Sequence, residues 1–120
     1  MNLMIVGAFG FLGSISRYII YLFESRYEHT FPYGTLVINT LGCLIAGVLI
    51  GLAAKASPQN RQLIMLGSIG FVGSFTTFST FSVETLNLLR TSQMVTAFAN
   101  VCVSLILGLM AVWLGMKIMD

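Results

Sequence analysis

The sequence has 120 residues, of which 57% are hydrophobic and only 8% are charged, whereas about 25% of the residues in a soluble domain are charged. This composition excludes a disordered chain and argues against a soluble domain, because so few charges would leave most of the surface apolar. Six basic and four acidic residues give a net charge of +2, too little for the basic face with which proteins bind nucleic acid.

Four long apolar segments follow one another, at residues 3–23, 35–54, 63–89 and 94–116. Each has the ~20 residues with which a helix crosses about 30 Å of hydrocarbon, and none alternates as barrel strands do. The sequence therefore predicts an all-α membrane protein, with residues 1–120 forming a single domain of four transmembrane helices. We expect the first helix to be permanent, because the basic region of a cleaved signal peptide does not precede it.

The connections and the cysteines give little sign of chemistry. Residues 24–33 hold the only histidine, His29, which we expect to be solvated. Cys43 and Cys102 both fall inside predicted spans, where small apolar core residues are expected rather than a disulfide or a thiolate metal site. The chain has no Ser-His-Asp set, no paired intramembrane carboxylates and no phosphate-binding loop, so we do not expect an enzyme.

The basic residues outside the spans are almost evenly divided between the two sides of the membrane. With four spans, Lys55, Arg61 and Lys117 share one side, and Arg26 and Arg90 share the other. The positive-inside rule needs a bias to fix the orientation. The chain therefore either inserts in both orientations, which would allow an antiparallel homodimer, or follows a weak but real bias.

Glycines recur at short spacings in three of the predicted helices. Such spacing lets helix backbones approach closely in lipid, either within one subunit or between subunits. The residues concerned are Gly7, Gly10 and Gly13, then Gly47 and Gly51, and finally Gly67, Gly70 and Gly73.

The third span is unusually polar at residues 67–84, GSIGFVGSFTTFSTFSVE. Because glycines followed by two β-branched threonines make a poor helix centre, we expect a break near residues 73–77. Such a break would free backbone carbonyls that can coordinate cations such as Na⁺. The alternative is an unbroken helix whose hydroxyls bond to its own turns. The hydroxyl residues are Ser74, Thr76, Thr77, Ser79, Thr80 and Ser82.

Aromatic and acidic residues complete this span. Phe75, Phe78 and Phe81 recur every three residues, which indicates either a packing ridge or, because ring edges are electropositive, the lining of an anion path. Glu84 ends the segment, either solvated or paired with Arg17 of the first span.

Amides lie within the second and fourth spans. Asn39 shares a helix face with Thr35 and Cys43. Its two N–H donors suit a small anion that is losing its water, or a hydrogen bond to another helix. Asn100 and Ser104 share one face of the fourth span, either as interhelical contacts or as pore lining.

Three sequence blocks resemble the Fluc/CrcB family of small dual-topology fluoride channels. They are GFVGSFTTFSTFSVE at residues 70–84, GTLVINTLG at residues 34–42 and GFLGSISRY at residues 10–18, in the order and spacing of that family. The fourth helix contributes only its polar positions. Departures include Ser74, where glycine is common, and Asn100, where tyrosine is often seen.

The resemblance implies an antiparallel homodimer in the lipid bilayer of the bacterial inner membrane. Its two pores would export fluoride passively, lower cytoplasmic fluoride and so confer fluoride resistance. Fluoride would accept a hydrogen bond from Asn39 and face the ring edges of Phe78 and Phe81. Arg17 would lie near a vestibule. The hydroxyls of a polar track would come from Ser79, Thr80 and Ser104.

The same resemblance implies a structural Na⁺ at the dimer axis, held by the backbone carbonyls of Gly73 and Thr76. Two other functions stay open from the residues alone. A small proton-coupled multidrug exporter would need an intramembrane carboxylate, for which Glu84 is the sole candidate. A non-transporting membrane subunit held by glycine packing would not need the six hydroxyls of the third span.

Overall fold

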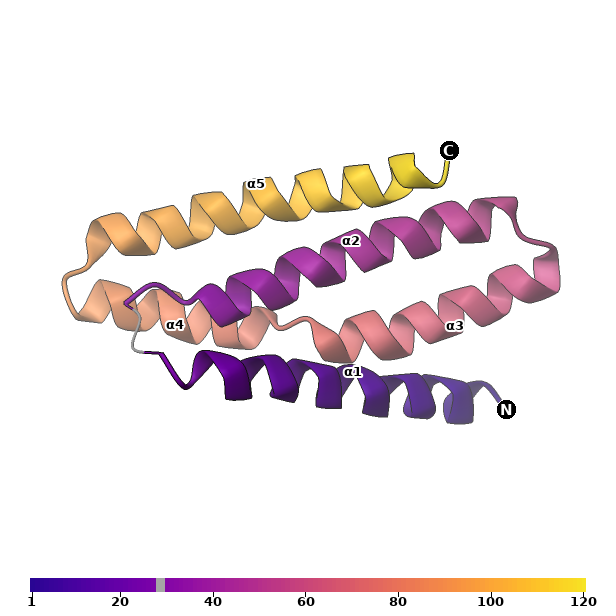
Figure 1. Ribbon diagram of the computed structural model, residues 1–120, viewed down its shortest axis with the longest axis horizontal. Helices are drawn as coiled ribbons and strands as arrows, with labels where there is room; N and C mark the ends of the chain where they lie inside the picture. The colour runs from indigo at the N-terminus through magenta and orange to yellow at the C-terminus, as the bar shows by residue number, and fades with distance from the viewer. Residues whose placement is uncertain (28–29) are drawn as a thin grey trace.

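The structure is a computed structural model that describes residues 1–27 and 30–120. His29 lies outside the described residues. The described residues form five helices, α1 (Asn2–Glu24), α2 (Tyr33–Lys55), α3 (Pro58–Phe75), α4 (Phe78–Arg90) and α5 (Met94–Ile118), as Figure 1 shows. Together α3 and α4 make one broken span of 33 residues, so the described residues contain four segments long and apolar enough to cross a membrane. The predicted all-α fold with four spans is confirmed.

Short sequence signals set the helix ends. Pro58 occupies the first turn of α3, where its missing N–H costs nothing. Lys55, Arg90 and Lys117 lie in the last turns of α2, α4 and α5, where a cation interacts favourably with the helix dipole. Between α4 and α5 the chain reverses through Ser92, whose φ of 61° is the left-handed conformation that often ends a helix.

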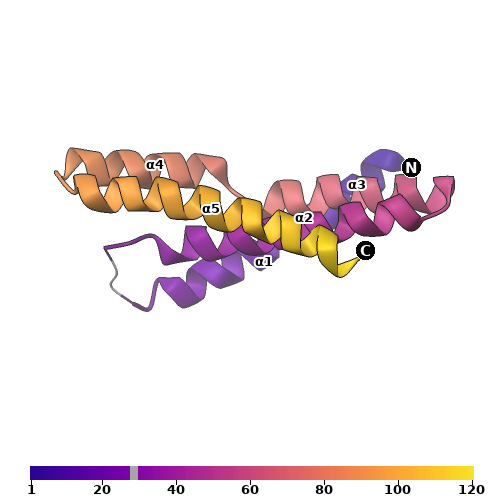
Figure 2. The same ribbon diagram turned by 90° about the horizontal axis from the view of Figure 1, so that it is seen from above.

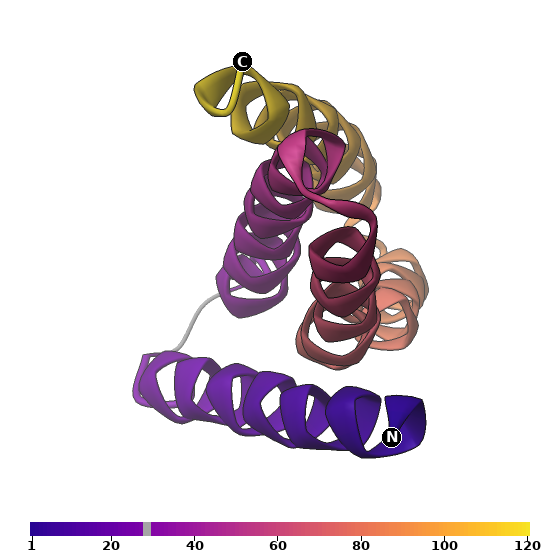
Figure 3. The ribbon, with the colours of Figure 1, turned by 90° about the vertical axis from the view of Figure 1, so that its right-hand side faces the viewer.

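The helices form an elongated bundle of 51 × 28 × 21 Å. α2 lies between α5 on one side and α3 on the other, while α1 packs mainly against α3. Figure 2 shows α3 and α4 end to end, and Figure 3 shows α1 crossing beneath the other helices. This arrangement brings the break between α3 and α4 next to the first half of α2.

Several glycines lie where the backbones of two helices approach closely. Gly47 of α2 packs against Val112 of α5, and Gly115 of α5 packs against Leu44 of α2. In the other pair, a Cβ on Gly70 of α3 would lie only 3.1 Å from the Gly10 nitrogen of α1. These glycines therefore serve packing within one chain, which the sequence had left open. By contrast, a Cβ added at Gly7 or Gly73 would have no packing neighbour within 4 Å among the residues that the structure describes.

The buried residues of this chain are few and partly polar. Thr35 and Asn100 are each only 1% exposed, beside the apolar Ile38 and Ala97. Large apolar side chains such as Phe11 of α1 and others along α5 face outward. This inverts the pattern of a soluble domain and fits a chain whose surroundings are hydrocarbon or another apolar surface. Both cysteines are free thiols.

Candidate pore at the helix break

The predicted break lies at Thr76 and Thr77, between the end of α3 and the start of α4. Both residues have extended backbone, with ψ of 159° and 110°. The break is confirmed but is narrower than the predicted 73–77, because Gly73 and Ser74 stay helical. Ser74 Oγ donates to the Gly70 carbonyl at 2.8 Å and Thr76 Oγ1 to the Val72 carbonyl at 2.9 Å. The Thr76 backbone N–H also donates to the Val72 carbonyl at 3.0 Å, which closes the last turn of α3.

The Asn39 side chain replaces one helix bond that the break removes, that of the Thr77 N–H, and it also bonds to the carbonyl of the same residue. Its Oδ1 accepts from the Thr77 backbone N–H at 2.8 Å, and its Nδ2 donates to the Thr77 carbonyl at 3.1 Å. The Thr77 N–H would bond to the Gly73 carbonyl if the helix continued. An unpaired backbone group is costly in a membrane. This two-point contact therefore lowers the free-energy cost of the break. The amide has a second N–H, which the Thr77 contact does not use.

A guanidinium group lies on the other side of the break. Arg17 Nη1, from α1, donates to the Thr76 carbonyl at 3.4 Å. The carbonyl end of a helix carries the negative end of its dipole, so a cation is stabilised at this position. Among the described residues Arg17 forms no ion pair with Glu84, whose Oε1 accepts from Thr35 Oγ1 at 2.8 Å. The pairing of Arg17 with Glu84, one of two sequence alternatives, is therefore not formed.

The start of α4 gathers three hydroxyls. Thr77 Oγ1 caps the helix by accepting from the Thr80 N–H at 3.2 Å. The same oxygen donates to Thr80 Oγ1 at 2.9 Å and lies 3.3 Å from Ser79 Oγ. Ser82 instead donates to the Phe78 carbonyl of its own helix. The six hydroxyls of this span thus fall into two groups. Ser74, Thr76 and Ser82 bond to their own turns, while Thr77, Ser79 and Thr80 cluster at the positive end of α4.

A cavity of about 330 Å³ lies beside the break. It brings together four residues of the predicted fluoride path, namely Asn39 of α2, Phe78 and Phe81 of α4, and Ser104 of α5. Thr76, predicted as a Na⁺ ligand, also lines it. The lining described for this cavity does not include the remaining predicted site residues, which are Ser79, Thr80, Arg17 and Gly73. Arg17 and Gly73 lie on the α1 and α3 side of the break. The cavity therefore combines an amide, a hydroxyl and two phenyl rings.

The break also divides the phenylalanine ridge into two parts. Phe75, before the break, is 4% exposed and stacks on Phe71 with centroids 5.5 Å apart. Phe78, after the break, is 80% exposed, and its ring lies 5.8 Å from that of Phe81 at an interplanar angle of 38°. Phe75 is thus a core residue, whereas Phe78 and Phe81 line the cavity.

Asn100 and Ser104 of α5 have different surroundings despite sharing a helix face. Asn100 is 1% exposed, and its Nδ2 donates to Thr85 Oγ1 of α4 at 2.9 Å. Ser104, one turn further on, lines the cavity. The sequence left both roles open for the pair. Asn100 makes an interhelical hydrogen bond, and Ser104 borders the candidate pore.

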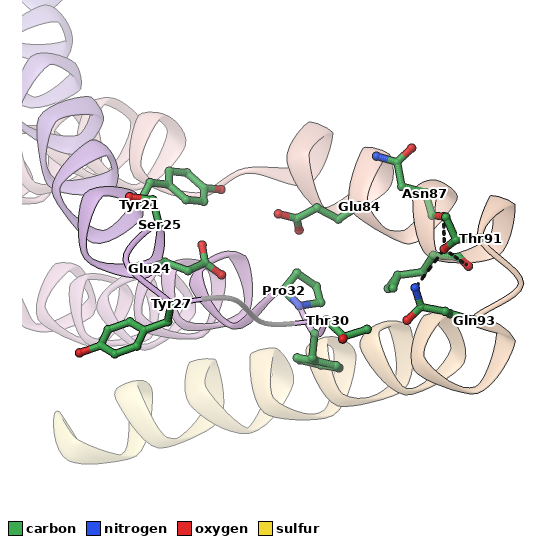
Figure 4. A pocket seen from close by; sticks show the side chains of 12 residues that line it. Tyr21, Glu24, Ser25, Tyr27, Thr30, Pro32, Glu84, Asn87, Thr91 and Gln93 are labelled. Atoms are coloured by element: carbon green, nitrogen blue, oxygen red, sulfur yellow. Dashed lines mark hydrogen bonds between the residues drawn. The ribbon is translucent and has the colours of Figure 1, made fainter.

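A second cavity of about 660 Å³ opens at the end of the bundle that holds the first connection (Figure 4). Tyr21, Glu24, Glu84 and Asn87 are among its lining residues. Glu24 Oε1 accepts from the Gly34 N–H at 2.6 Å, in the first turn of α2. Neither Tyr21 nor Glu24 was predicted as a site residue, because each reaches this cavity through helix packing rather than through a motif in the sequence.

Comparison with known proteins identifies the family. The family model described as "CrcB-like protein, Camphor Resistance (CrcB)" matches residues 4–116. A protein of Flavobacterium psychrophilum named "Fluoride-specific ion channel FluC" is 41% identical, with 91% of this chain and 89% of that protein covered. Proteins with the same name from Shewanella loihica and Elusimicrobium minutum are 37% and 42% identical. Their alignments cover 98% and 94% of this chain, and 94% and 89% of theirs.

The extent of these matches includes the features of the candidate site. The family match runs from the start of α1 almost to the end of α5 and so covers the break, Asn39 and the cavity. The relatives are bacterial, and the chain has four segments able to span a membrane. The chain is a multi-pass bacterial membrane protein, and it belongs to the CrcB-like family.

Proposed function

We propose that this chain is a fluoride-selective ion channel that exports fluoride passively across the bacterial inner membrane. The name shared by the relatives, "Fluoride-specific ion channel FluC", supports this function. The single observation that carries it is the cavity at the helix break, where Asn39, Ser104 and two phenylalanines meet. Donors of this kind suit a small anion, and the family match and the names of the relatives support a channel rather than an enzyme.

The residues of the cavity match the needs of fluoride. A conducting site must replace the water of the ion, yet bind weakly enough to release it. The remaining N–H of Asn39, the Ser104 hydroxyl and the ring edges of Phe78 and Phe81 are uncharged donors of this strength. No lysine or arginine is among the residues described as lining the cavity, so no fixed cation would trap the ion there.

The helix break positions these groups. Because Thr77 takes one N–H and the carbonyl oxygen of the Asn39 amide, the amide plane is fixed and its other N–H has a fixed direction. Beyond the cavity, Ser79 and Thr80 would continue a polar track along the start of α4. Arg17 would attract anions toward a vestibule, its guanidinium anchored on the Thr76 carbonyl.

We further propose an antiparallel homodimer with two pores. The exposed Phe78 ring, the open space at Gly73 and the small core of one chain support a partner subunit. The balanced basic residues support insertion in both orientations. In the lipid bilayer, a second copy would complete the walls that one chain leaves open.

The carbonyls of Gly73 and Thr76 would hold a structural Na⁺ at the dimer axis. Their chemistry fits the ion, because uncharged oxygens at the carbonyl end of α3 favour a hard cation. The Thr77 N–H, which would otherwise bond to the Gly73 carbonyl, donates to Asn39. The Thr76 carbonyl already attracts one cation, the Arg17 guanidinium. A bound Na⁺ would supply positive charge that stabilises these carbonyls.

The test is fluoride release from liposomes that contain only the purified protein, with chloride release measured in parallel. We expect rapid fluoride release with negligible chloride release, at the same rate with and without a proton gradient. Release that requires a proton gradient would instead indicate a coupled exporter working through Glu84. No fluoride release from a folded protein would overturn the proposed function and favour a non-transporting subunit.

A further inference from the structure

A chain of hydrogen bonds joins three helices between the two cavities. Thr35 of α2 donates through Oγ1 to Glu84 Oε1 of α4 at 2.8 Å, and its oxygen lies 3.1 Å from the hydroxyl of Tyr21 of α1. Thr35 precedes Asn39 by one turn and Glu84 follows Phe81 by one turn. These hydrogen bonds therefore lie one helical turn from residues of the 330 Å³ cavity at the break, called here the pore cavity. Tyr21 and Glu84 line the 660 Å³ cavity at the end of the bundle, called here the mouth cavity.

The number of hydrogens on each group determines which group donates in each of these hydrogen bonds. A threonine hydroxyl has one hydrogen and two acceptor lone pairs. Since Thr35 gives its hydrogen to the Glu84 carboxylate, the Tyr21 hydroxyl must be the donor in the bond to Thr35. Figure 4 shows the Tyr21 hydroxyl and the Glu84 carboxylate directed toward each other across the mouth cavity. The Tyr21 hydroxyl thus donates to the same Thr35 oxygen that donates to Glu84.

Thr35 differs from six other hydroxyl residues of this protein, which bond within their own helices. Ser16, Ser74, Thr76, Ser82, Thr85 and Thr91 each donate to a carbonyl four residues earlier in their own helix. Thr35 lies in the first turn of α2 and is 1% exposed, and it donates to another helix. A donor from Tyr21 occupies one lone pair of its oxygen and so restricts the rotation of the hydroxyl.

The Glu84 carboxylate needs this restraint. Its Oε2 is buried and has no hydrogen-bond partner among the described residues, so the Thr35 bond alone holds the group. Glu24, the other carboxylate of the mouth cavity, is likewise held by the first turn of α2, through the Gly34 N–H. The positive end of the α2 dipole thus faces both acids. A carboxylate released from α2 could swing toward the pore cavity, where its charge would repel an anion.

We propose that Tyr21 is a positioning residue for fluoride passage, acting through Thr35 to keep the Glu84 carboxylate on α2 and out of the ion path. This role rests on the proposed function. Loss of the Tyr21 hydroxyl loosens one neutral hydrogen bond, for which we expect a three- to tenfold decrease in fluoride flux, on the order of what one such bond contributes.

The flux experiment compares Tyr21→Phe with Tyr18→Phe in liposomes. Tyr18 lies on the same helix and is 62% exposed, so its variant should conduct like the wild type. In a Thr35→Val background, Tyr21→Phe should cause no further decrease, because the link to Glu84 is already absent. Thr35→Ser, which keeps the hydroxyl, should restore both the flux and its dependence on Tyr21. Equal flux of Tyr21→Phe and wild type, or additive losses with Thr35→Val, would overturn the proposal.

An infrared measurement separates this proposal from the proposed function. The difference spectrum of wild type and Glu84→Gln identifies the Glu84 carboxyl band. Tyr21→Phe should shift that band, and Tyr18→Phe should not. An unshifted band would overturn the hydrogen-bond chain even in a conducting protein. If Tyr21→Phe shifts the band but the wild-type protein releases no fluoride, the hydrogen bonds from Tyr21 through Thr35 to Glu84 would be supported. Their role in fluoride passage would then be overturned, together with the proposed function.

Discussion

The two sides of α2 contact their neighbours by different means. Toward α5, Gly47 and Gly115 let backbone approach backbone, and few polar side chains take part. Toward the break and α4, the side chains of Asn39 and Thr35 make hydrogen bonds to Thr77 and Glu84. Packing of small residues is what holds helices together in lipid, whereas polar groups at membrane depth are costly and mark function. The same helix thus carries a structural face and a functional face.

Asn39→Asp should disrupt the contacts of the functional face, and we expect it to have the largest effect on fluoride flux. The variant keeps an oxygen for the Thr77 N–H but replaces the donor that faces the Thr77 carbonyl with a second, anionic oxygen. Loss of this bond and a fixed negative charge in the cavity should lower fluoride flux at least about 100-fold, which corresponds to roughly 3 kcal/mol. Liposome flux measures this loss.

The control for this variant is Asn60→Asp, the same chemical change at an exposed position near the start of α3. It should conduct like the wild type. An Asn39→Asp protein that is folded and conducts at the wild-type rate would refute a pore at the break.

Gly115→Ala should disrupt the close contact between α2 and α5 on the structural face. Its added Cβ would meet the Leu44 carbonyl and lie 2.8 Å from the Val48 nitrogen, and backbone atoms cannot move aside as a flexible side chain can. We expect a loss of about 2–3 kcal/mol in stability, seen as a lower thermal unfolding temperature in detergent. Gly7→Ala would have no packing neighbour within 4 Å of the new Cβ among the residues that the structure describes and should unfold like the wild type. Equal unfolding temperatures for the two variants would contradict the α2–α5 contact.

Phe78→Ile should lower fluoride flux without lowering stability, and so separate the functional face from the structural face. The side chain is 80% exposed in one chain and borders the cavity. Replacing it removes an aromatic edge but little buried area, so fluoride flux should fall about tenfold, consistent with one aromatic contact, at nearly unchanged unfolding temperature. Phe98→Ile, at a similarly exposed position of α5, serves as the matched control. Equal flux from both variants would argue against a role for the Phe78 ring.

Local sequence patterns were sufficient for the fold but not for the details of the break. Apolar runs of spanning length predict the four segments because hydrocarbon imposes one length on every spanning helix. The threonine pair predicts a break because β-branched residues disfavour a helix centre. The same pattern does not show that Gly73 and Ser74 stay helical, or that the hydroxyls of Ser74 and Thr76 bond to carbonyls of their own helix. Each of these hydroxyls could equally have bonded elsewhere.

Four of the six residues predicted for the fluoride path line one cavity, whereas the contacts that organise them were not predictable from the sequence. Asn39, Phe78, Phe81 and Ser104 were chosen from residue chemistry and a family resemblance, and the structure gathers them around one cavity. The contacts that organise them join residues far apart in the chain. The bond from Asn39 to Thr77 spans 38 positions, and that from Arg17 to Thr76 spans 59. Such contacts depend on how whole helices pack, which no local pattern encodes.

The smallest predicted effect concerns a polar contact that lies away from the cavity. Asn100→Leu removes the donor to Thr85 Oγ1 but keeps a side chain of similar size at a buried position. Thr85 still donates to the Phe81 carbonyl at 2.7 Å, so no buried hydroxyl is left without a bond. We expect a loss of about 1 kcal/mol in stability and less than a twofold change in fluoride flux, measured on the same preparation.

This last variant tests whether polarity alone marks the functional face. Asn39 and Asn100 are both amides within the spans, and both donate to a neighbouring helix. They differ in what they hold, because Asn39 bonds to backbone that the break has freed, whereas Asn100 bonds to a hydroxyl that already has a partner in its own helix. A large loss of flux in Asn100→Leu would mean that the functional face extends along α4 to α5. A small loss would confine it to the break, where a side chain takes the place of a helix bond.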